Sequence, residues 1–154
     1  MQQKVLIIGG GFAGIRTALD LTKKPGFEIT LISKNPNFEY YPGLHKMIST
    51  RKQAVVQVPL ETIFKNKKVN VILDTVTAVD IEQKTATTTN GTYSGDFLVL
   101  ALGSQNEYFG IAGLPEMAYG FKSVEEALKL RGHIEQLFEN HTKTDKAETV
   151  VGLH

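Results

Sequence analysis

Residues 5–14 of the chain read Val5-Leu6-Ile7-Ile8-Gly9-Gly10-Gly11-Phe12-Ala13-Gly14. A short apolar run, typical of a buried strand, passes directly into a glycine-rich turn. A helix is predicted from Ile15 to Lys24, and residues 28–32 form a second β-rich run. Strand, glycine turn, helix and strand are the context in which a G-x-G-x-x-G string indicates a dinucleotide-binding unit. The competing interpretation is an ordinary strand-to-helix turn, and the two flanking strands argue against it.

Each glycine of this string has a separate physical task in such a unit. Gly9 lets the chain turn sharply out of the strand, and Gly11 leaves room for a pyrophosphate to approach the backbone. Gly14 lets the helix pack closely against the sheet. The helix N-terminus then presents N–H groups and the positive end of its dipole to the phosphates, so no lysine is required to neutralise them.

The second strand closes at Ile32 and is followed by Ser33 and Lys34. At this position the dinucleotide fold normally carries an Asp or Glu that hydrogen-bonds the ribose. A serine hydroxyl can reach a ribose oxygen, but it binds more weakly than a carboxylate, so a carboxylate at position 33 is expected to tighten binding. The Ser-Lys pair can instead favour a 2′-phosphate, which would indicate NADP, and this alternative stays open.

The composition of the 154-residue chain is that of an ordinary globular protein. Lysine and arginine number 17 against 16 aspartates and glutamates, the net charge is +1, and 42% of the residues are hydrophobic. This charge provides no broad field for binding nucleic acid. Cysteine is absent, so this stretch has no disulfide, thiolate metal site or redox C-x-x-C pair. No apolar run reaches the roughly 18 residues of a membrane span, and the first residues do not resemble a signal peptide, so we expect a cytoplasmic protein.

The middle of the chain predicts further strands. Residues 69–73, 75–82 and 84–89 read as strands, and Asn90-Gly91 marks a tight reversal, which together predict an inserted antiparallel β-meander. The apolar run 97–102 is typical of a strand buried on both faces. Its carboxyl end should lie beside the glycine turn, because open α/β sheets bind ligands at that edge. The predicted fold class is α/β, a Rossmann-like domain of three layers with a parallel sheet.

Helices are predicted at two further places. Residues 59–64 read as a short surface helix that begins at Pro59. The sequence Ser123-Val124-Glu125-Glu126 is a capping box, which opens a helix that runs to about Asn140. Residues 142–146 are predicted to be a polar linker, and residues 149–152 begin what reads as another strand.

A cluster of aromatic side chains lies in residues 38–44, Phe38-Glu39-Tyr40-Tyr41-Pro42-Gly43-Leu44. These side chains serve either as packing under a long connection or as a wall beside a flat ring system. The residues themselves favour neither interpretation.

No residue is assigned a catalytic role, and no metal site is predicted. The histidines lack metal-ligand spacing, and two of them are predicted on one surface helix. They are His45, His133, His141 and His154. The nucleophile-elbow and H-E-x-x-H motifs are absent. A chain with so little chemistry of its own is typical of a cofactor-dependent enzyme.

Several stretches together resemble the type II NADH dehydrogenases, which are single-polypeptide, FAD-containing NADH:quinone oxidoreductases of the pyridine nucleotide-disulfide oxidoreductase superfamily. These stretches are residues 5–14, 29–35, 40–44 and 96–104. Residues 106–133, which include Tyr108-Phe109-Gly110-Ile111, resemble this family in particular. The resemblance covers about residues 4–141 and implies an FAD/NAD(P)-binding, Rossmann-like fold.

In that family the first glycine motif binds FAD. Carried over by position, the residues at the pyrophosphate would be Gly9, Gly11, Phe12, Ala13 and Gly14. The adenosine ribose would meet Ser33 and Lys34, and the adenine would meet the backbone of Val76. Pro42 would lie near the isoalloxazine. The residues along the rest of the FAD chain would be Ala101, Leu102 and Gly103.

The implied activity passes electrons from NADH through FAD to a quinone, with the NADH site outside this chain. The family's second glycine motif and its NADH domain have no counterpart here, so the chain alone is expected to be inactive. We predict an incomplete FAD-binding domain in residues 1–141, a linker in residues 142–148 and the start of an NADH-binding domain in residues 149–154. The implied partners of the full-length enzyme are NADH and a quinone. Peripheral contact with the cytoplasmic face of a membrane, through a C-terminal region, and a homo-oligomer are compatible with the resemblance.

Two alternatives stay open. The chain could belong to another FAD- and NAD(P)-dependent reductase of the same superfamily, although the disulfide and sulfide branches are disfavoured because they use redox cysteines. It could also be a stand-alone dinucleotide-binding module, for FAD or NADP, without turnover.

Overall fold

The computed structural model describes residues 2–49 and 56–141. These residues form two compact units, which are described separately. The first, here called the sheet unit, consists of residues 2–39 and 57–104. The second, here called the helical unit, consists of residues 40–49, 56 and 105–141. The expected linker at 142–148 and the strand expected to begin at 149 lie outside the described residues.

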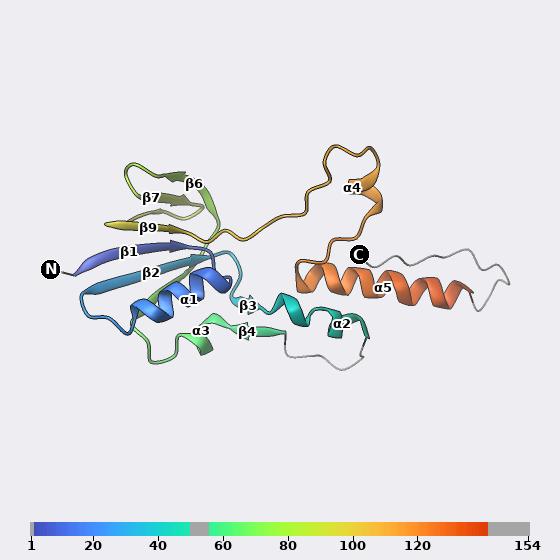
Figure 1. Ribbon diagram of the computed structural model, residues 1–154, viewed down its shortest axis with the longest axis horizontal. Helices are drawn as coiled ribbons and strands as arrows, with labels where there is room; N and C mark the ends of the chain where they lie inside the picture. Colours follow the sequence, from blue (N-terminus) through green and yellow to red (C-terminus); the bar gives the residue numbers. More distant parts are fainter. Residues whose placement is uncertain (1, 50–55, 142–154) are drawn as a thin grey trace. The chain divides into compact units, whose positions relative to one another are not determined.

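The sheet unit is built on four parallel strands in the order β5-β2-β1-β9 (Figure 1). The strands are β1 (Gln3–Ile8), β2 (Phe27–Ser33), β5 (Val69–Leu73) and β9 (Phe97–Leu100). Val5 pairs with Ile29 on one side and with Phe97 on the other, and Ile29 pairs with Val69. Each neighbouring pair is parallel, which is the arrangement expected from the strand–helix–strand pattern at the start of the chain.

The two faces of β1 bury alternate side chains, as the period of two in a strand requires. Val5 and Ile7 pack against helix α1 (Phe12–Leu21), in a core that includes Ile15 and Ala18. Leu6 and Ile8 point to the opposite face and pack in a second core with Ala86. Burying a side chain of this size stabilises a fold by about 1.5–3 kcal/mol, so both faces of the strand contribute to stability.

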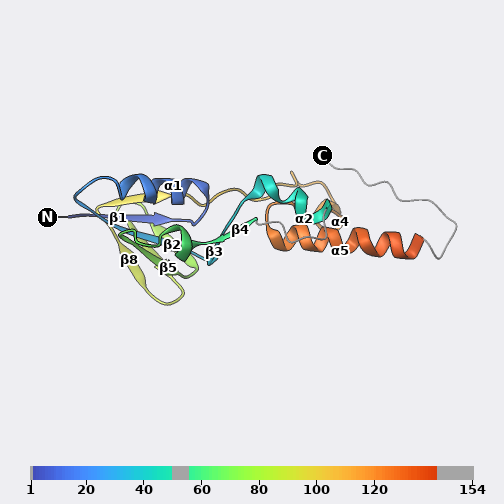
Figure 2. The same cartoon turned by 90° about the horizontal axis from the view of Figure 1, so that it is seen from below.

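The opposite face is covered by an antiparallel meander of three strands. They are β6 (Val76–Asp80), β7 (Thr85–Thr88) and β8 (Thr92–Ser94). The β7–β8 reversal lies at Asn90-Gly91, where the Thr88 N–H donates to the Gly91 carbonyl at 2.7 Å. Figure 2 shows helix α1 on one face of the parallel sheet and the meander on the other. The predicted three-layer α/β fold with an inserted meander is therefore confirmed.

Helix α1 begins and ends earlier than the predicted Ile15 to Lys24. Gly11 is its N-cap, with an extended backbone (φ −89°, ψ −168°), so the helix starts immediately after the glycine turn. At the other end the Lys23 N–H donates to the Asp20 carbonyl and the Lys24 N–H to the Leu21 carbonyl, at 3.3 and 3.0 Å. These i→i+3 bonds tighten the chain into a turn before Pro25 is reached, which is why the helix does not extend to Lys24.

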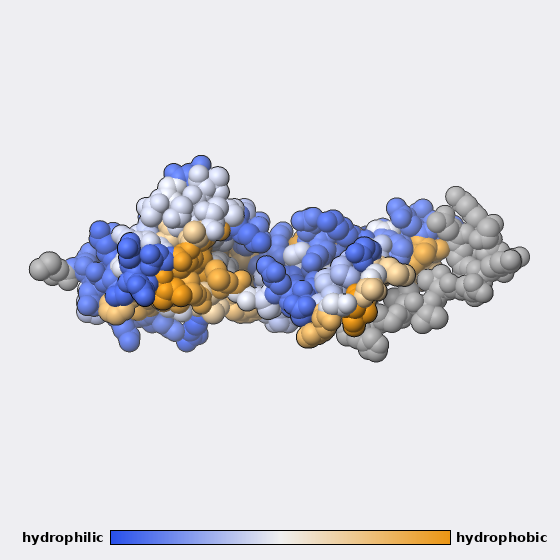
Figure 3. Space-filling model, turned by 90° about the horizontal axis from the view of Figure 1, so that it is seen from above, coloured by the Kyte–Doolittle hydropathy of each residue, from blue (hydrophilic) through white to orange (hydrophobic). Residues whose placement is uncertain are grey.

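Strand β9 is not buried on both faces, and that prediction was wrong. Within the described residues β9 pairs only with β1 and forms an edge of the sheet, where Phe97 and Leu100 are each 47% exposed. An apolar area is visible on the sheet unit in Figure 3. A continuous apolar run records hydrophobicity, but it does not tell how many neighbours a strand has. The start of the pairing is held by the Asp96 carboxylate, which accepts a hydrogen bond from the Lys4 N–H at 2.7 Å.

A short antiparallel pair, β3 (Asn37–Glu39) and β4 (Gln57–Pro59), leads into helix α3 (Leu60–Ile63). Pro59 is the N-cap of this helix rather than its first residue. The predicted helix is present and somewhat shorter than expected. Its Leu60 side chain is 1% exposed and packs, with Phe64, in the core beneath helix α1.

The helical unit contains a 3-10 turn, η1 (Tyr41–Gly43), and the helices α2 (His45–Ser49), α4 (Leu114–Met117) and α5 (Val124–His141). Its core consists of Leu44, Met47, Val56, Val124 and Ala127. The predicted capping box is present, because the Glu126 N–H donates to the Ser123 Oγ at 3.1 Å. His133 and His141 both lie in α5, as predicted. No helix in the described ranges combines the length and the apolar character needed to cross a bilayer.

Candidate functional site

The carboxyl ends of all four parallel strands meet at one edge of the sheet unit. Backbone hydrogen bonds fix their relative positions there. The Gly9 N–H donates to the Ile32 carbonyl at 2.8 Å, and the Ala101 N–H donates to the Ile8 carbonyl at 2.8 Å. The Asp74 N–H donates to the Ser33 carbonyl at 3.0 Å. Open α/β sheets bind ligands at this edge, so it is the candidate site.

Two glycines of the turn are required by close backbone contacts. Gly9 has a φ of +115°, a conformation that L-residues with side chains rarely adopt, and a Cβ atom there would collide with the Ala101 carbonyl. A Cβ atom on Gly14 would collide with the Gly9 carbonyl. The strand β1, helix α1 and the end of β9 therefore approach each other at distances that only glycine permits. The expected proximity of the β9 end to the glycine turn is observed.

Gly11 differs from these two positions because it faces open space. Its φ is −89°, and no other group lies within 4 Å of the position that a Cβ atom would occupy. No side chain caps the N-terminus of helix α1, whose first N–H groups lie in the residues that follow Gly11. The first intrahelical bond runs from the Ile15 N–H to the Gly11 carbonyl at 3.0 Å. A phosphate group can therefore approach the backbone here without displacing protein atoms.

Gly10 is a residue of this turn that sequence reasoning missed. A Cβ atom on Gly10 would lie 2.5 Å from the Ser33 Oγ, 2.9 Å from the Ser33 Cβ and 3.2 Å from the Leu60 Cδ1. The residue packs the turn against the end of β2 and against helix α3. The available signal was the uninterrupted run Gly9-Gly10-Gly11, because the dinucleotide motif leaves its second position open to any residue.

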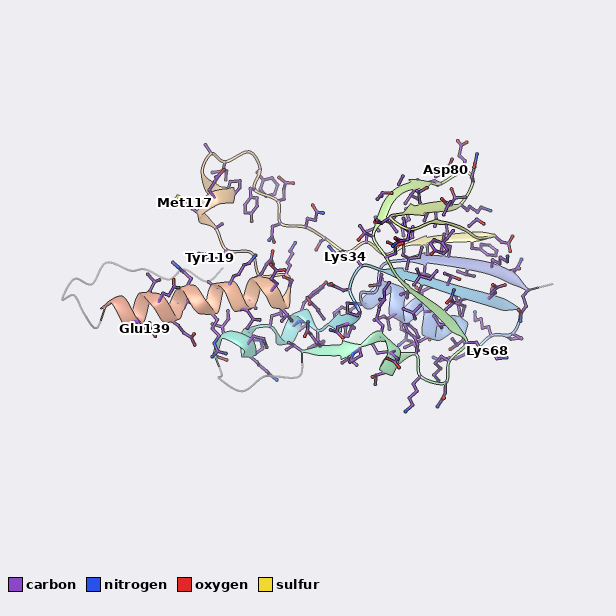
Figure 4. The ribbon with its side chains drawn as sticks, turned by 180° about the vertical axis from the view of Figure 1, so that it is seen from behind. Lys34, Lys68, Asp80, Met117, Tyr119 and Glu139 are labelled. Carbon is purple, nitrogen blue, oxygen red and sulfur yellow. The ribbon has the colours of Figure 1, made fainter. Side chains whose placement is uncertain are left out.

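Ser33 lies at the end of β2, directly beside the glycine turn, and is 5% exposed. Its hydroxyl donates to the Asn35 carbonyl at 2.8 Å and accepts from the Asn35 N–H at 3.3 Å. The hydroxyl proton is thus used within the chain, and only acceptor capacity remains for a ligand. Lys34, between these two residues, is exposed and lies at the end of the sheet that carries the candidate site (Figure 4).

Asp74 and Val76 follow the end of the neighbouring strand β5. The Asp74 carboxylate accepts hydrogen bonds from the Thr75 N–H at 2.7 Å and the Asn90 N–H at 3.1 Å. Together with a hydrogen bond to the Thr88 side chain, which is the largest cause, these bonds lower the pKa of Asp74. Val76 is half-buried against the core beneath the meander. Asp74 is therefore an anion committed to the turn between β5 and the meander.

The remaining predicted site residues fall in two places. Gly103 has a φ of +77° and open space around it, and Leu102 is 68% exposed, so both lie at the surface after β9. Phe12 and Ala13 open helix α1 and are exposed. Pro42 belongs to the helical unit, in the turn η1, where its carbonyl lies 2.9 Å from the His45 Nδ1. The structure brings together all the predicted site residues except Pro42 in the sheet unit.

The aromatic segment 38–44 divides between the two units. Phe38 packs against the core of the sheet unit and meets the Phe12 ring edge-on, with centroids 4.8 Å apart. Leu44 is fully buried in the helical unit, whereas Tyr40 and Tyr41 are about half exposed, at 45% and 47%. Packing is therefore the role of Phe38 and Leu44, and a role for the tyrosines beside a ring remains a prediction.

A second concave surface lies within the helical unit. It has a volume of about 580 Å³ and is lined by residues 105–109 and 119–122. It contains none of the predicted site residues and is shallow and open. The described part of the chain also holds no cluster of three or more His, Cys, Asp or Glu side chains that could bind a metal ion. The carboxyl edge of the sheet unit remains the candidate site.

An open parallel sheet with a glycine turn that leads into a helix at its carboxyl edge defines the class of dinucleotide-binding, Rossmann-like domains. Comparison with protein families agrees with this class. The chain belongs to the pyridine nucleotide-disulphide oxidoreductase family, whose family model matches residues 3–152.

Individual relatives narrow the comparison. The chain is 35% identical over 151 residues to a type II NADH:quinone oxidoreductase of Staphylococcus haemolyticus (strain JCSC1435), and 36% identical to that of Staphylococcus aureus (strain NCTC 8325 / PS 47). Each alignment covers 96% of this chain and 38% of the relative. The chain therefore spans well under half the length of the curated relatives it matches.

Solved structures show the same fold. The sulfide:quinone oxidoreductase of Aquifex aeolicus superposes with a TM-score of 0.80 at 32% identity, over 90% of this chain and 33% of that one. NDH2 of Plasmodium falciparum, in complex with NADH, superposes with a TM-score of 0.81 at 25% identity, over 96% of this chain and 32% of that one. The predicted resemblance to type II NADH dehydrogenases is confirmed by these matches.

Proposed function

We propose that the sheet unit binds FAD at the β1–α1 glycine turn and is part of an enzyme that passes electrons from NADH through FAD to a quinone. The observation that carries the proposal is the open space at Gly11, in a turn whose neighbouring glycines Gly9 and Gly14 are closely packed. The relatives named NADH:quinone oxidoreductases support the choice of substrates. Residues 1–141 would then form the FAD-binding part, followed by a linker at 142–148 and an NADH-binding part from 149.

The residues present fit a dinucleotide at this edge. Gly11 and the first turn of helix α1 would face the pyrophosphate, with Phe12 and Ala13 supplying backbone N–H groups. The end of β2, at Ser33 and Lys34, and the backbone near Val76 would face the adenosine. Ala101, Leu102 and Gly103 would lie along the FAD chain. Pro42 would lie near the flavin ring.

The chemistry that FAD supplies when bound is two-electron transfer between a nicotinamide and a quinone. The part played by this chain is binding and orientation. The closely packed turn holds the phosphate-facing backbone rigidly, because Gly9 and Gly14 are locked against Ala101 and against each other. NADH, a quinone and peripheral contact with the cytoplasmic face of a membrane belong to the proposal for the full-length protein.

The test is the substitution Gly11→Val, with Gly132→Val as the matched control. Both glycines face open space and have ordinary backbone angles, so neither substitution should disturb folding. Valine at position 11 would occupy the space that the pyrophosphate needs. We expect the parent chain and Gly132→Val to bind FAD and turn yellow, and Gly11→Val to lose most of its FAD affinity in a fluorescence titration. Equal FAD binding by all three proteins would refute the assignment of the site.

A further inference from the structure

The adenosine end of the candidate site lacks the acidic group that normally selects an unmodified ribose. In dinucleotide-binding folds, an Asp or Glu at the end of the second strand accepts a hydrogen bond from the ribose 2′-hydroxyl and repels a 2′-phosphate. Here β2 ends at Ser33, whose hydroxyl proton is donated to the Asn35 carbonyl at 2.8 Å. The position therefore carries neither a negative charge nor a free proton donor.

The bonds between Ser33 and Asn35 also shape the turn that carries Lys34. The Ser33 hydroxyl donates to the Asn35 carbonyl and accepts from the Asn35 N–H, which closes the backbone around the residue between them. Ser33 is itself held beside Gly10, because the two residues are in close contact. Lys34 is left exposed at the ligand-binding edge and forms no ion pair with any residue in the described ranges.

The nearest acid along the sheet edge does not restore the missing selectivity. Asp74 lies beside Ser33, through the hydrogen bond from its N–H to the Ser33 carbonyl. Its carboxylate oxygens are occupied by the N–H groups of Thr75 and Asn90, in the turn that leads to the meander. A lysine ammonium is thus the available charged group where a 2′-substituent of the ribose would lie, and it attracts phosphate.

We infer that this site accepts adenine nucleotides that carry a 2′-phosphate, of the NADP type, and binds them more tightly than their unphosphorylated counterparts, with Lys34 as the residue that determines this preference. The inference rests on the proposed function, because it assumes that the adenosine of the dinucleotide lies at the end of β2. It predicts that NADP competes with FAD for the same site in a protein that lacks bound flavin.

The experiment measures direct binding of three probes by calorimetry at low salt: 5′-AMP, adenosine 2′,5′-bisphosphate and adenosine 3′,5′-bisphosphate. The two bisphosphates have the same charge, so their comparison separates recognition of the 2′-position from general attraction of anions. We expect the 2′,5′-bisphosphate to bind about five- to tenfold more tightly than 5′-AMP, the scale of a charge-assisted hydrogen bond at an exposed site. The preference should weaken as salt is added.

The matched variants are Lys34→Ala and Lys68→Ala. Figure 4 shows Lys34 and Lys68 at opposite ends of the parallel sheet, so each change removes one exposed positive charge and only the first is at the site. We expect Lys34→Ala to abolish the preference for the 2′,5′-bisphosphate, Lys34→Glu to reverse it, and Lys68→Ala to leave it unchanged.

The failures of the two proposals have different signatures. If FAD binds and Gly11→Val removes it, but the 2′-phosphate brings no gain or Lys34→Ala has no effect, the inference is overturned and the proposed function stands. A gain that is equal for the 2′- and 3′-phosphates also overturns the inference, because it shows only general attraction of anions. If neither FAD nor any of the three probes binds, both proposals fail.

Discussion

The side chain of Ser33 lies in the space that a Cβ atom on Gly10 would need. Such an atom would be 2.5 Å from the Ser33 Oγ and 2.9 Å from the Ser33 Cβ, closer than real Cβ contacts come. The middle glycine of the turn and the last residue of β2 are therefore a matched pair. The glycine turn and the adenosine end of the candidate site are built as one packed structure, although the two residues are far apart in the sequence.

We expect Gly10→Ala to destabilise the sheet unit by about 1–3 kcal/mol, the usual cost of forcing additional atoms into a packed site. Ser33 cannot move aside freely, because its hydroxyl is bonded to Asn35 and its side chain is buried. The control is Gly11→Ala, whose new methyl group would meet no other atom within 4 Å. Urea unfolding followed by circular dichroism measures both variants. Equal stabilities of the two would contradict the close packing of Gly10.

We expect Ser33→Ala to lower the free energy of unfolding by about 1 kcal/mol, the net value of a typical hydrogen bond. The FAD affinity should change little, because the hydroxyl proton is donated to the Asn35 carbonyl rather than being available to a ligand. Thermal unfolding and an FAD titration of the same variant separate the two effects. A loss of FAD affinity of about tenfold or more, with stability intact, would show that Ser33 binds the ribose directly.

In the helical unit, we expect Ser123→Ala to lower stability by about 1 kcal/mol through loss of the helix N-cap. The Ser123 Oγ accepts the Glu126 N–H at 3.1 Å, and alanine leaves that donor without its acceptor. Ser123→Asp keeps an acceptor at the same position and should retain the stability of the parent. Helix content and the unfolding midpoint are the measurements. An alanine variant as stable as the aspartate variant would mean that the cap contributes nothing to α5.

Asp74 should make the sheet unit sensitive to acid. The hydrogen bonds from Thr88, Thr75 and Asn90 lower the pKa of its carboxyl from 3.8. Because the folded-state pKa lies below that of the unfolded chain, the stabilisation is complete above the unfolded pKa and is lost as the pH falls through the lower folded pKa. Asp74→Asn should therefore flatten the dependence of the unfolding free energy on pH below about 4. Unfolding series at several pH values provide the slopes, and identical slopes for parent and variant would count against this role of Asp74.

Local patterns in the sequence determined much of the fold. The β1–α1–β2 unit follows from an apolar run, a glycine turn and an amphipathic helix, all of which act within about thirty residues of each other. The meander follows from period-two patterns and the Asn90-Gly91 reversal, and the start of α5 follows from its capping box. In these elements the residues that decide the conformation are neighbours in the chain, so their order is sufficient to predict them.

The tertiary structure decided what depends on residues that are distant in the sequence. The apolar run of β9 could not reveal that the strand has one neighbour, because pairing is set by the order of strands in the sheet. The need for glycine at position 10 comes from Ser33 and Leu60, and the role of the Ser33 hydroxyl comes from the way the chain turns back at Asn35. The sequence by itself determined that a dinucleotide motif is present and where it begins. Only the packed structure decided which of its side chains remain available to a ligand, because burial and hydrogen bonding commit Ser33 and Asp74 to the protein and leave Lys34 exposed.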